Sequence, residues 1–458
     1  MHNDSTYLFY DIETTGLNKC FDQVLQFAAI RTDLKLQEIE RHEIHVRLNN
    51  DVIPSPYAVI THRIGPSQFD QGLSELDAIQ KIHTLLNTPN TISVGYNSLG
   101  FDDEFLRFSF YRNLLTPYTH QYANRCGRMD IYPITMLYYL FKKELLEWPE
   151  GNLKLENISA KNQLAEGLAH NAMVDVIATL ALARKLMVDP AMWSFVTGYF
   201  QKAVDNDRVK NSESVLHIGN QAHPMGLLVY GKIGTKDSYV APVVLLGQHL
   251  HYKNQTLFLR LDTPDIVKTE KDTPSKTTRI FRKRCGEPPL FLPLKARYTT
   301  LLSEDRQQLM SANQQFLSEN TAIFDAIRQY YQHEKYPEHP KRDIDAALYM
   351  IDFPSSREEK LFREFHLATP SEKLSIAEKF PNPLRKAQAK RILRRHFSDI
   401  LTDNETHLET PIDFRGEKKY TLEQALIDIE EIQTKKELNA EQINLIAELK
   451  IYYETKTR

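Results

Sequence analysis

The stretch Leu8–Gly16, LFYDIETTG, decides how the beginning of this chain folds. It reads as a strand, and residues two apart on a strand point to the same face, so Asp11 and Glu13 lie side by side. The two threonines and the glycine that follow supply the turn that ends the strand. Like charges this close repel unless a cation lies between them, and a divalent metal ion is the usual solution. Taken alone, the stretch is equally typical of an edge strand with solvated acids.

A second acidic segment is Gly95–Phe105, GYNSLGFDDEF, which joins an apolar strand at 91–96 to a helix. Asp102 and Asp103 occupy the first turn of that helix. Acids are favoured there by the free amides and by the helix dipole, so either residue can simply cap the helix. The segment therefore supplies a third candidate metal ligand but does not require one.

A third segment, Ala169–Val176, AHNAMVDV, opens a helix that we expect to begin after Asn171. Asp175 is the only charged residue between positions 172 and 183. Such an acid is costly to bury unless it is paired or binds a metal, and we favour the metal. His170 precedes the helix. With His170 in the loop and Asp175 one turn in, both side chains can face one cleft.

These residues, in this order, resemble the catalytic set of the DEDDh 3′–5′ exonucleases of the RNase H-like superfamily: Asp11, Glu13, Asp102, His170 and Asp175. Within that superfamily, QFAAIRTD at 26–33, YNSLGFDDEFLR at 96–107 and AHNAMVDV at 169–176 resemble the bacterial exodeoxyribonuclease I family. The resemblance is dense over residues 7–187 and looser afterwards. The motifs are specific for the family as a set, although each motif alone is a weak signal.

Hydrolysis of a phosphodiester needs an activated water and neutralisation of the transition state, which two metal ions about 3.5–4 Å apart can supply. We expect Asp11 to bridge two Mg²⁺ ions, with Glu13 and Asp175 completing their shells and Asp102 helping to hold the second ion. Mn²⁺ should substitute for Mg²⁺. His170 is the expected general base. The family motif places its metal acid directly after Phe101, so Asp103 is left out.

Length and composition fit an intracellular enzyme of several domains. The chain has 458 residues, and its three cysteines form no C-x-x-C pair, so neither disulfides nor a zinc site are indicated. We expect a reducing compartment, no signal peptide, no membrane helix and a cytoplasmic location. The net charge of −3 indicates that any DNA-binding potential must be local.

The first part of the chain predicts an RNase H-like α/β sheet. Strands are expected at 7–13, 24–31, 39–47 and 91–96, and helices at 74–86, 101–114, 133–146 and 172–186. Short connections between the first three strands indicate antiparallel pairing. Residues 54–68, PSPYAVITHRIGPSQ, are expected to form a Pro-bounded loop. The family has a corresponding loop over the terminal base, but the sequence at 61–65 departs from its usual motif. His62 and Arg63 are either DNA contacts or solvated loop residues.

The remainder predicts two further parts. Short β-like runs at 227–231, 239–246 and 256–261 indicate a small barrel or sheet, and the resemblance implies that it is SH3-like. The chain from about 343 reads as helical, with one basic helix at 383–397 and a helical hairpin at 421–453. We therefore expect an exonuclease domain at 1–190, an SH3-like domain at 191–342 and a helical C-terminal domain at 343–458.

Two basic segments are candidate DNA contacts. RIFRKR at 279–284 places an aromatic ring among basic side chains, which can stack bases along a phosphate backbone. The helix at 383–397 carries a basic stripe, whose binding to phosphates would depend on salt. In both cases a solvated surface is the alternative. With Arg63, the candidates are Arg282, Lys283, Arg284, Lys390, Arg391, Arg394 and Arg395.

The five residues predict a metal-dependent exonuclease, and the resemblance implies that it is a processive 3′–5′ enzyme that degrades single-stranded DNA to 5′-mononucleotides with Mg²⁺ in repair and recombination. The resemblance also implies a monomer that binds the C-terminal tail of single-stranded DNA-binding protein. Two alternatives stay open at this point. The same nuclease core can trim RNA, and the chain can be a nucleic-acid-binding repair scaffold without activity.

Overall fold

The computed structural model describes residues 4–400 and 410–456. The chain divides into two compact units. The first unit contains 1–128, 165–180 and 337–458, and the second contains 129–164 and 181–336. The predicted division into domains at 1–190, 191–342 and 343–458 stays a prediction.

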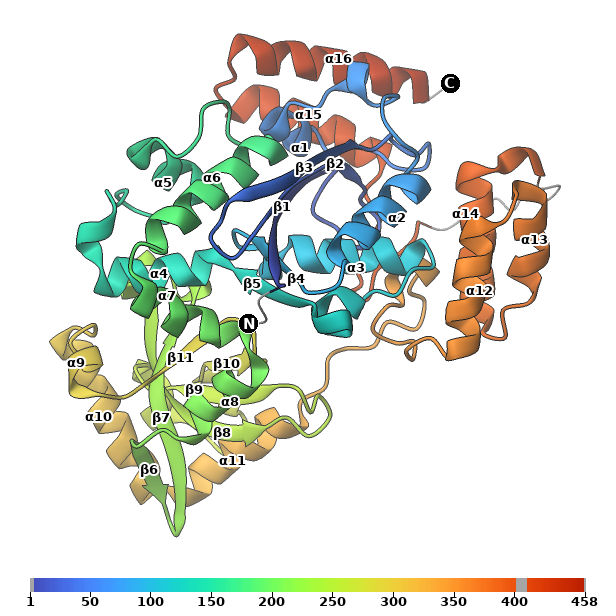
Figure 1. Cartoon of the computed structure of the whole chain (residues 1–458). Helices are drawn as coiled ribbons and strands as arrows, with labels where there is room; N and C mark the ends of the chain where they lie inside the picture. Colours follow the sequence, from blue (N-terminus) through green and yellow to red (C-terminus); the bar gives the residue numbers. More distant parts are fainter. Residues whose placement is uncertain (1–3, 401–409, 457–458) are drawn as a thin grey trace. The chain divides into compact units, whose positions relative to one another are not determined.

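The first unit is built on a five-stranded sheet with the order β3-β2-β1-β4-β5. The strands are β1 (Thr6–Thr14), β2 (Val24–Thr32), β3 (Glu38–His45), β4 (Thr91–Gly95) and β5 (Gly127–Asp130). β1, β2 and β3 pair antiparallel, as predicted, and β4 runs parallel to β1. β1 lies at the centre of the sheet, so its first residues are buried on both faces (Figure 1).

Helices cover this sheet where the apolar spacing predicts them. α2 (Glu75–Leu86), α3 (Asp102–Arg112) and α6 (Ala172–Leu186) match the predicted helices, with small shifts at the ends. Leu8, Tyr10 and Ile12 of β1 pack in one core cluster with apolar residues of α2 and α3. That face is fully apolar, so Asp11 and Glu13 are directed to the opposite face, near the end of the strand.

The prediction of a loop at 54–68 is wrong in part, because residues 56–62 form helix α1 (Pro56–His62). Pro56 stands at the first helical turn, where its missing N–H costs nothing. Val59 and Ile60 are buried in a cluster with apolar residues of α15 and α16. This contact with helices almost 400 residues later in the chain stabilises α1.

The C-terminal part of the first unit is helical, as predicted. It contains α12 (Ser356–Leu367), α13 (Pro370–Glu378), α14 (Pro383–His396), α15 (Leu422–Lys435) and α16 (Ala440–Lys456). The last two form the predicted hairpin, with Asn439 capping α16, and both lie beside α1 (Figure 1). The C-terminal hairpin is thus part of the same compact unit as the sheet.

The second unit contains the predicted β-rich part. Its antiparallel sheet has the order β10-β9-β8-β7-β11, and β6 pairs with β7. The strands are β6 (Val215–Ile218), β7 (Gln221–Val229), β8 (Val240–Gln248), β9 (Thr256–Arg260), β10 (Ile280–Lys283) and β11 (Leu290–Pro293). The helices are α4 (Ile131–Phe141), α5 (Leu155–Asn162), α7 (Pro190–Thr197), α8 (Lys202–Lys210), α9 (Ala296–Thr299), α10 (Glu304–Glu319) and α11 (Thr321–His333). No helix within 4–400 or 410–456 is long and apolar enough to cross a membrane.

Candidate metal centre and active site

Three carboxylates converge at the end of the central strand. Asp11 and Glu13 extend from the same face of β1, and Asp175 comes from the first turn of α6. One oxygen atom of each lies within 4.8 Å of the others. In the sequence Asp175 is more than 160 positions from Asp11 and Glu13, and the fold brings all three together.

Burial and mutual repulsion both oppose ionisation of these carboxylates. Burial raises the pKa of Asp11 well above its usual range, and the neighbouring carboxylates add to the effect. For Glu13, burial and then the charges of Asp175 and Asp102 raise the pKa to about 9. A divalent cation among these oxygens would stabilise their charged forms. The donor set, which consists of carboxylates, fits a hard ion such as Mg²⁺ or Mn²⁺.

Asp102 is the first residue of α3 and is buried. It does not belong to the three-carboxylate cluster, but its charge raises the pKa of both Asp11 and Glu13. Asp102 is therefore close enough for its charge to act on Asp11 and Glu13. This is consistent with the predicted role in holding a second ion, which stays a prediction.

Asp103, the neighbouring acid, lies in a separate buried network. Its carboxylate accepts hydrogen bonds from His120 at 2.9 Å and Arg128 at 2.7 Å, and it pairs with Arg107 at 3.1 Å. Although burial opposes ionisation, these partners hold the pKa of Asp103 well below its usual range. Its charge is thus already compensated by protein groups, which agrees with leaving it out of the metal ligands.

His170 stands in the loop before α6, as predicted, and is exposed. Its backbone is left-handed, with a φ of 63°, and its N–H donates to Oδ2 of Asp175 at 3.1 Å. The helix begins directly after it, because the side chain of Asn171 accepts the N–H groups of Met173 and Val174. An exposed histidine whose backbone bonds to Asp175 is a candidate for proton transfer.

A pocket of about 360 Å³ adjoins His170. His62 lines it and is buried, and burial lowers its pKa to about 4, with the nearby His170 adding to the effect. Arg63, also on the pocket wall, pairs with Glu441 of α16 at 2.9 Å. The interpretation of these two residues as solvated loop positions is therefore wrong for His62, which is buried in the last turn of α1.

The basic segment at 279–284 is divided between surface and interior. Arg282 pairs with Glu334 and lies over the ring of Tyr336, and Arg284 lies 3.7 Å from Glu287. Lys283 is fully buried, and its ammonium donates to Asp205 at 2.6 Å and to two backbone carbonyls. Its three donors are all used inside the protein. We therefore withdraw Lys283 from the predicted DNA contacts.

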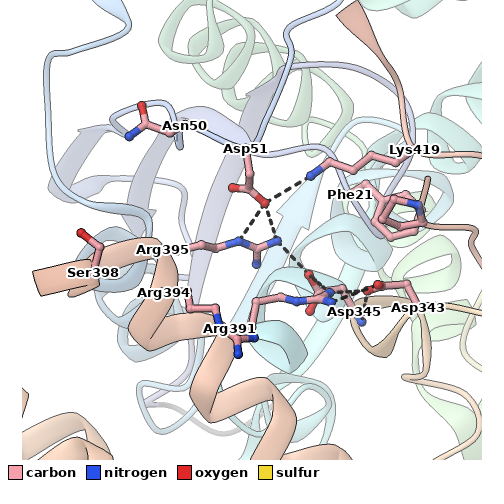
Figure 2. A pocket seen from close by; sticks show the side chains of 11 residues that line it. Phe21, Asn50, Asp51, Asp343, Asp345, Arg391, Arg394, Arg395, Ser398 and Lys419 are labelled. Carbon is pink, nitrogen blue, oxygen red and sulfur yellow. Dashed lines mark hydrogen bonds and ion pairs between the residues drawn. The ribbon is translucent and has the colours of Figure 1, made fainter. Parts of the chain in front are cut away.

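The basic stripe of α14 faces acids of the same unit. Figure 2 shows Arg391 directed at Asp343 and Asp345, and Arg395 directed at Asp51 and Asp345. These arginines and Arg394 line a pocket of about 400 Å³. Lys390 pairs with Glu378 at 2.9 Å. Much of the stripe is thus neutralised within the protein, which the sequence could not indicate because the acids come from distant segments.

The comparisons with known proteins agree with this geometry. Residues 8–183 match the family described as Exonuclease. The crystal structure of E. coli exonuclease I in complex with a dA16 oligonucleotide is similar with a TM-score of 0.85, at 22% identity, over 99% of this chain and 100% of that chain. Exonuclease I from Methylocaldum szegediense gives a TM-score of 0.81 at 25% identity, again over 99% and 100%.

The similarity extends to sequence. Exodeoxyribonuclease I of Escherichia coli strain K12 is 28% identical over 370 residues, which are 75% of this chain and 76% of that protein. The Haemophilus influenzae protein of the same name is 31% identical over 278 residues, which are 58% of this chain and 56% of that protein.

The α/β fold and the acidic cluster, together with the match over residues 8–183, define an exonuclease domain. The predicted fold class, with an SH3-like β domain and a helical C-terminal part, is confirmed by the match over the whole chain. Over three quarters of its length the chain is similar to exodeoxyribonuclease I of Escherichia coli, and its fold matches that of E. coli exonuclease I over nearly the whole chain.

Proposed function

We propose that this chain is a 3′–5′ exodeoxyribonuclease that hydrolyses single-stranded DNA to 5′-mononucleotides. The observation that carries the proposal is the convergence of Asp11, Glu13 and Asp175 within 4.8 Å, with Asp102 acting on the same cluster. The family supports DNA as the substrate. The solved relative bound to a dA16 oligonucleotide supports a single strand.

The acidic residues would hold two divalent ions, for which we propose Mg²⁺, with Mn²⁺ as a substitute. Such ions neutralise charge on the phosphodiester and lower the pKa of water. A zinc-bound form of E. coli exonuclease I with single-stranded DNA is known. Asp11, Glu13 and Asp175 would hold the ions, with Asp11 as the ligand common to both, and Asp102 would help to hold the second ion.

His170 acts as the general base in this proposal. His170 is exposed in the loop before α6, and in this role its imidazole would take a proton from the attacking water. The backbone bond from His170 to Asp175 fixes the loop relative to the metal ligand. Replacement of a general base typically costs about 10²–10⁴-fold in rate. We expect His170→Ala to lose rate in this range while Mn²⁺ binding is retained.

We also propose single-stranded DNA-binding protein as a partner. A similar solved structure is described as single-stranded DNA-binding protein/exonuclease I in complex with an inhibitor. Processive action by a cytoplasmic monomer in DNA repair completes the proposal. Analytical ultracentrifugation tests the monomer, and pull-down with a peptide of the partner's C-terminal tail tests the interaction. Either can fail without affecting the nuclease assignment.

The decisive experiment is a time course with a 5′-labelled single-stranded DNA, the matched RNA and a blunt duplex, each with Mg²⁺ and with EDTA. We expect metal-dependent shortening of the DNA from its 3′ end, with RNA and duplex spared. Trimming of RNA would assign a ribonuclease instead. Metal-independent binding without cleavage would assign a scaffold. A trap of unlabelled DNA added after initiation tests processivity.

A further inference from the structure

We infer that Gln26 is a positioning residue of the proposed metal centre, because its side-chain amide fastens the first turn of α6 to the central sheet. α6 carries Asp175, and the strand next to Gln26 carries Glu13. The inference rests on the proposed function, since it concerns the same metal centre.

Gln26 lies directly opposite Glu13 in the antiparallel pair of β1 and β2, so both side chains extend from the same face of the sheet. It is 2% exposed. Its Oε1 accepts the backbone N–H of Ala172, the first residue of α6, at 3.3 Å. Its Nε2 donates to Oε1 of Glu43 on β3 at 2.7 Å. One side chain therefore links two strands to the start of the helix.

The start of α6 depends on this link. The first N–H groups of a helix have no partner within the helix. Asn171 accepts those of Met173 and Val174 through its side chain, but the N–H of Ala172 is bound by Gln26, 146 residues away in the sequence. Ala172 is fully buried, so its N–H cannot turn to water instead.

The first turn of α6 positions both proposed active-site residues of this segment, Asp175 and His170. The N–H of Asp175 donates to the carbonyl of Asn171 at 3.0 Å, and Oδ2 of Asp175 accepts the N–H of His170 at 3.1 Å. Movement of the first turn of α6 would therefore displace both the ligand and the proposed base relative to Glu13.

The chemistry of the position requires an amide. Ionised Glu43 only accepts hydrogen bonds, so the NH₂ end of Gln26 is turned toward it and the carbonyl end toward α6. Glutamate at this position would lose the donor and repel Glu43, and methionine would keep the volume with neither bond. Sequence reasoning missed Gln26, although it is the single polar residue in the apolar run 24–30, VLQFAAI.

The test compares Gln26→Met with Gln23→Met. Gln23 is a matched control because it is fully buried and uses both ends of its amide, donating to the Arg47 carbonyl at 2.6 Å and accepting from the Asn49 N–H at 2.9 Å. Its side chain reaches the loop after β3 and not α6. The measurements are Mn²⁺ affinity by electron paramagnetic resonance without DNA, kcat and KM at saturating Mg²⁺, and melting temperature.

We expect Gln26→Met to lower Mn²⁺ affinity or kcat by about 10–100-fold, the usual loss for an outer partner of a metal ligand, with KM for DNA changed less than about twofold. Gln23→Met should change melting temperature only. Equal metal affinity and kcat in the two folded variants would overturn the inference.

A second variant, Glu43→Ala, keeps the test decisive if Gln26→Met does not fold. The side chain of Glu43 is 42% exposed, so its loss should be tolerated. Glu43→Ala should also lower metal affinity or kcat, but by a smaller factor than Gln26→Met. Gln26 would lose its hydrogen bond to Glu43, whereas its Oε1 would still accept the N–H of Ala172. No change in either quantity would also contradict the inference. An inactive wild type that still binds Mn²⁺ would refute the proposed function and leave the positioning role measurable.

Discussion

At Asp11, several carboxylates act on one side chain that is itself partly buried, and this arrangement predicts how the site responds to substitution. We expect Asp11→Asn to reduce hydrolysis by more than about 100-fold, beyond the loss typical of outer partners of a metal ligand. In EDTA the variant should melt at or above the wild-type temperature, because the amide carries no charge for burial and the neighbouring carboxylates to oppose. Activity assays and circular dichroism check this. Full activity of the variant would refute the metal centre.

The raised pKa of Glu13 predicts a pH dependence of stability without metal. A carboxyl group whose pKa rises from 4.5 to about 9 on folding binds more protons in the folded state. Its contribution is fully present below pH 4.5 and is lost as the pH rises toward 9. In EDTA the melting temperature should therefore decrease as the pH is raised from 4.5 to about 9. Over the same pH range the increase in melting temperature on adding Mg²⁺ should become larger. The same pH profile for Glu13→Gln as for the wild type would contradict this cause.

At the scale of elements, α16 braces the segment that carries His62 and Arg63. The hydroxyl of buried Tyr453 donates to the carbonyl of Pro54, and Gln442 donates to that of Ile60 at 3.1 Å. Gly65 faces Leu445 so closely that a Cβ would lie 2.6 Å from its Cδ2. The hairpin therefore fixes the segment beside His170 at several points.

This bracing predicts the effect of Tyr453→Phe. The substitution leaves the buried carbonyl of Pro54 without its donor, which should lower the free energy of unfolding by about 1–3 kcal/mol. Glu454→Gln, on the exposed side of α16, is the control and should change it by less than about 0.5 kcal/mol. Urea denaturation measures both. Equal stability of the two variants would show that the bond does not brace the segment.

For the whole molecule, the net charge of −3 means that DNA must be attracted by local groups. We expect the affinity for single-stranded DNA, measured with Ca²⁺ in place of Mg²⁺, to fall with salt. Arg284→Ala should reduce the slope of log affinity against log salt by about 0.7, the value for one phosphate contact to a single strand. Lys283→Met should lower stability without changing that slope. A smaller slope for Lys283→Met, with an unchanged slope for Arg284→Ala, would restore Lys283 as a DNA contact.

The sequence by itself determined several elements, among them β1 and α6, and the acids that these two carry. The alternation around Asp11 and Glu13 and the apolar spacing of α6 are local, and local periodicity specifies which face each side chain takes. The strands β1 and β2 and the helices α6 and α14 therefore lie within one or two residues of their predicted bounds.

Only the tertiary structure decided which groups those side chains meet. The bond from Gln26 to Ala172, the burial of Lys283 against Asp205 and the packing of α1 on α16 each join residues more than 70 positions apart. No periodicity in the sequence encodes such a pair. Whether a charge binds a partner or faces solvent depends on which distant segment packs against it, because burial and neighbouring charge are properties of the folded chain.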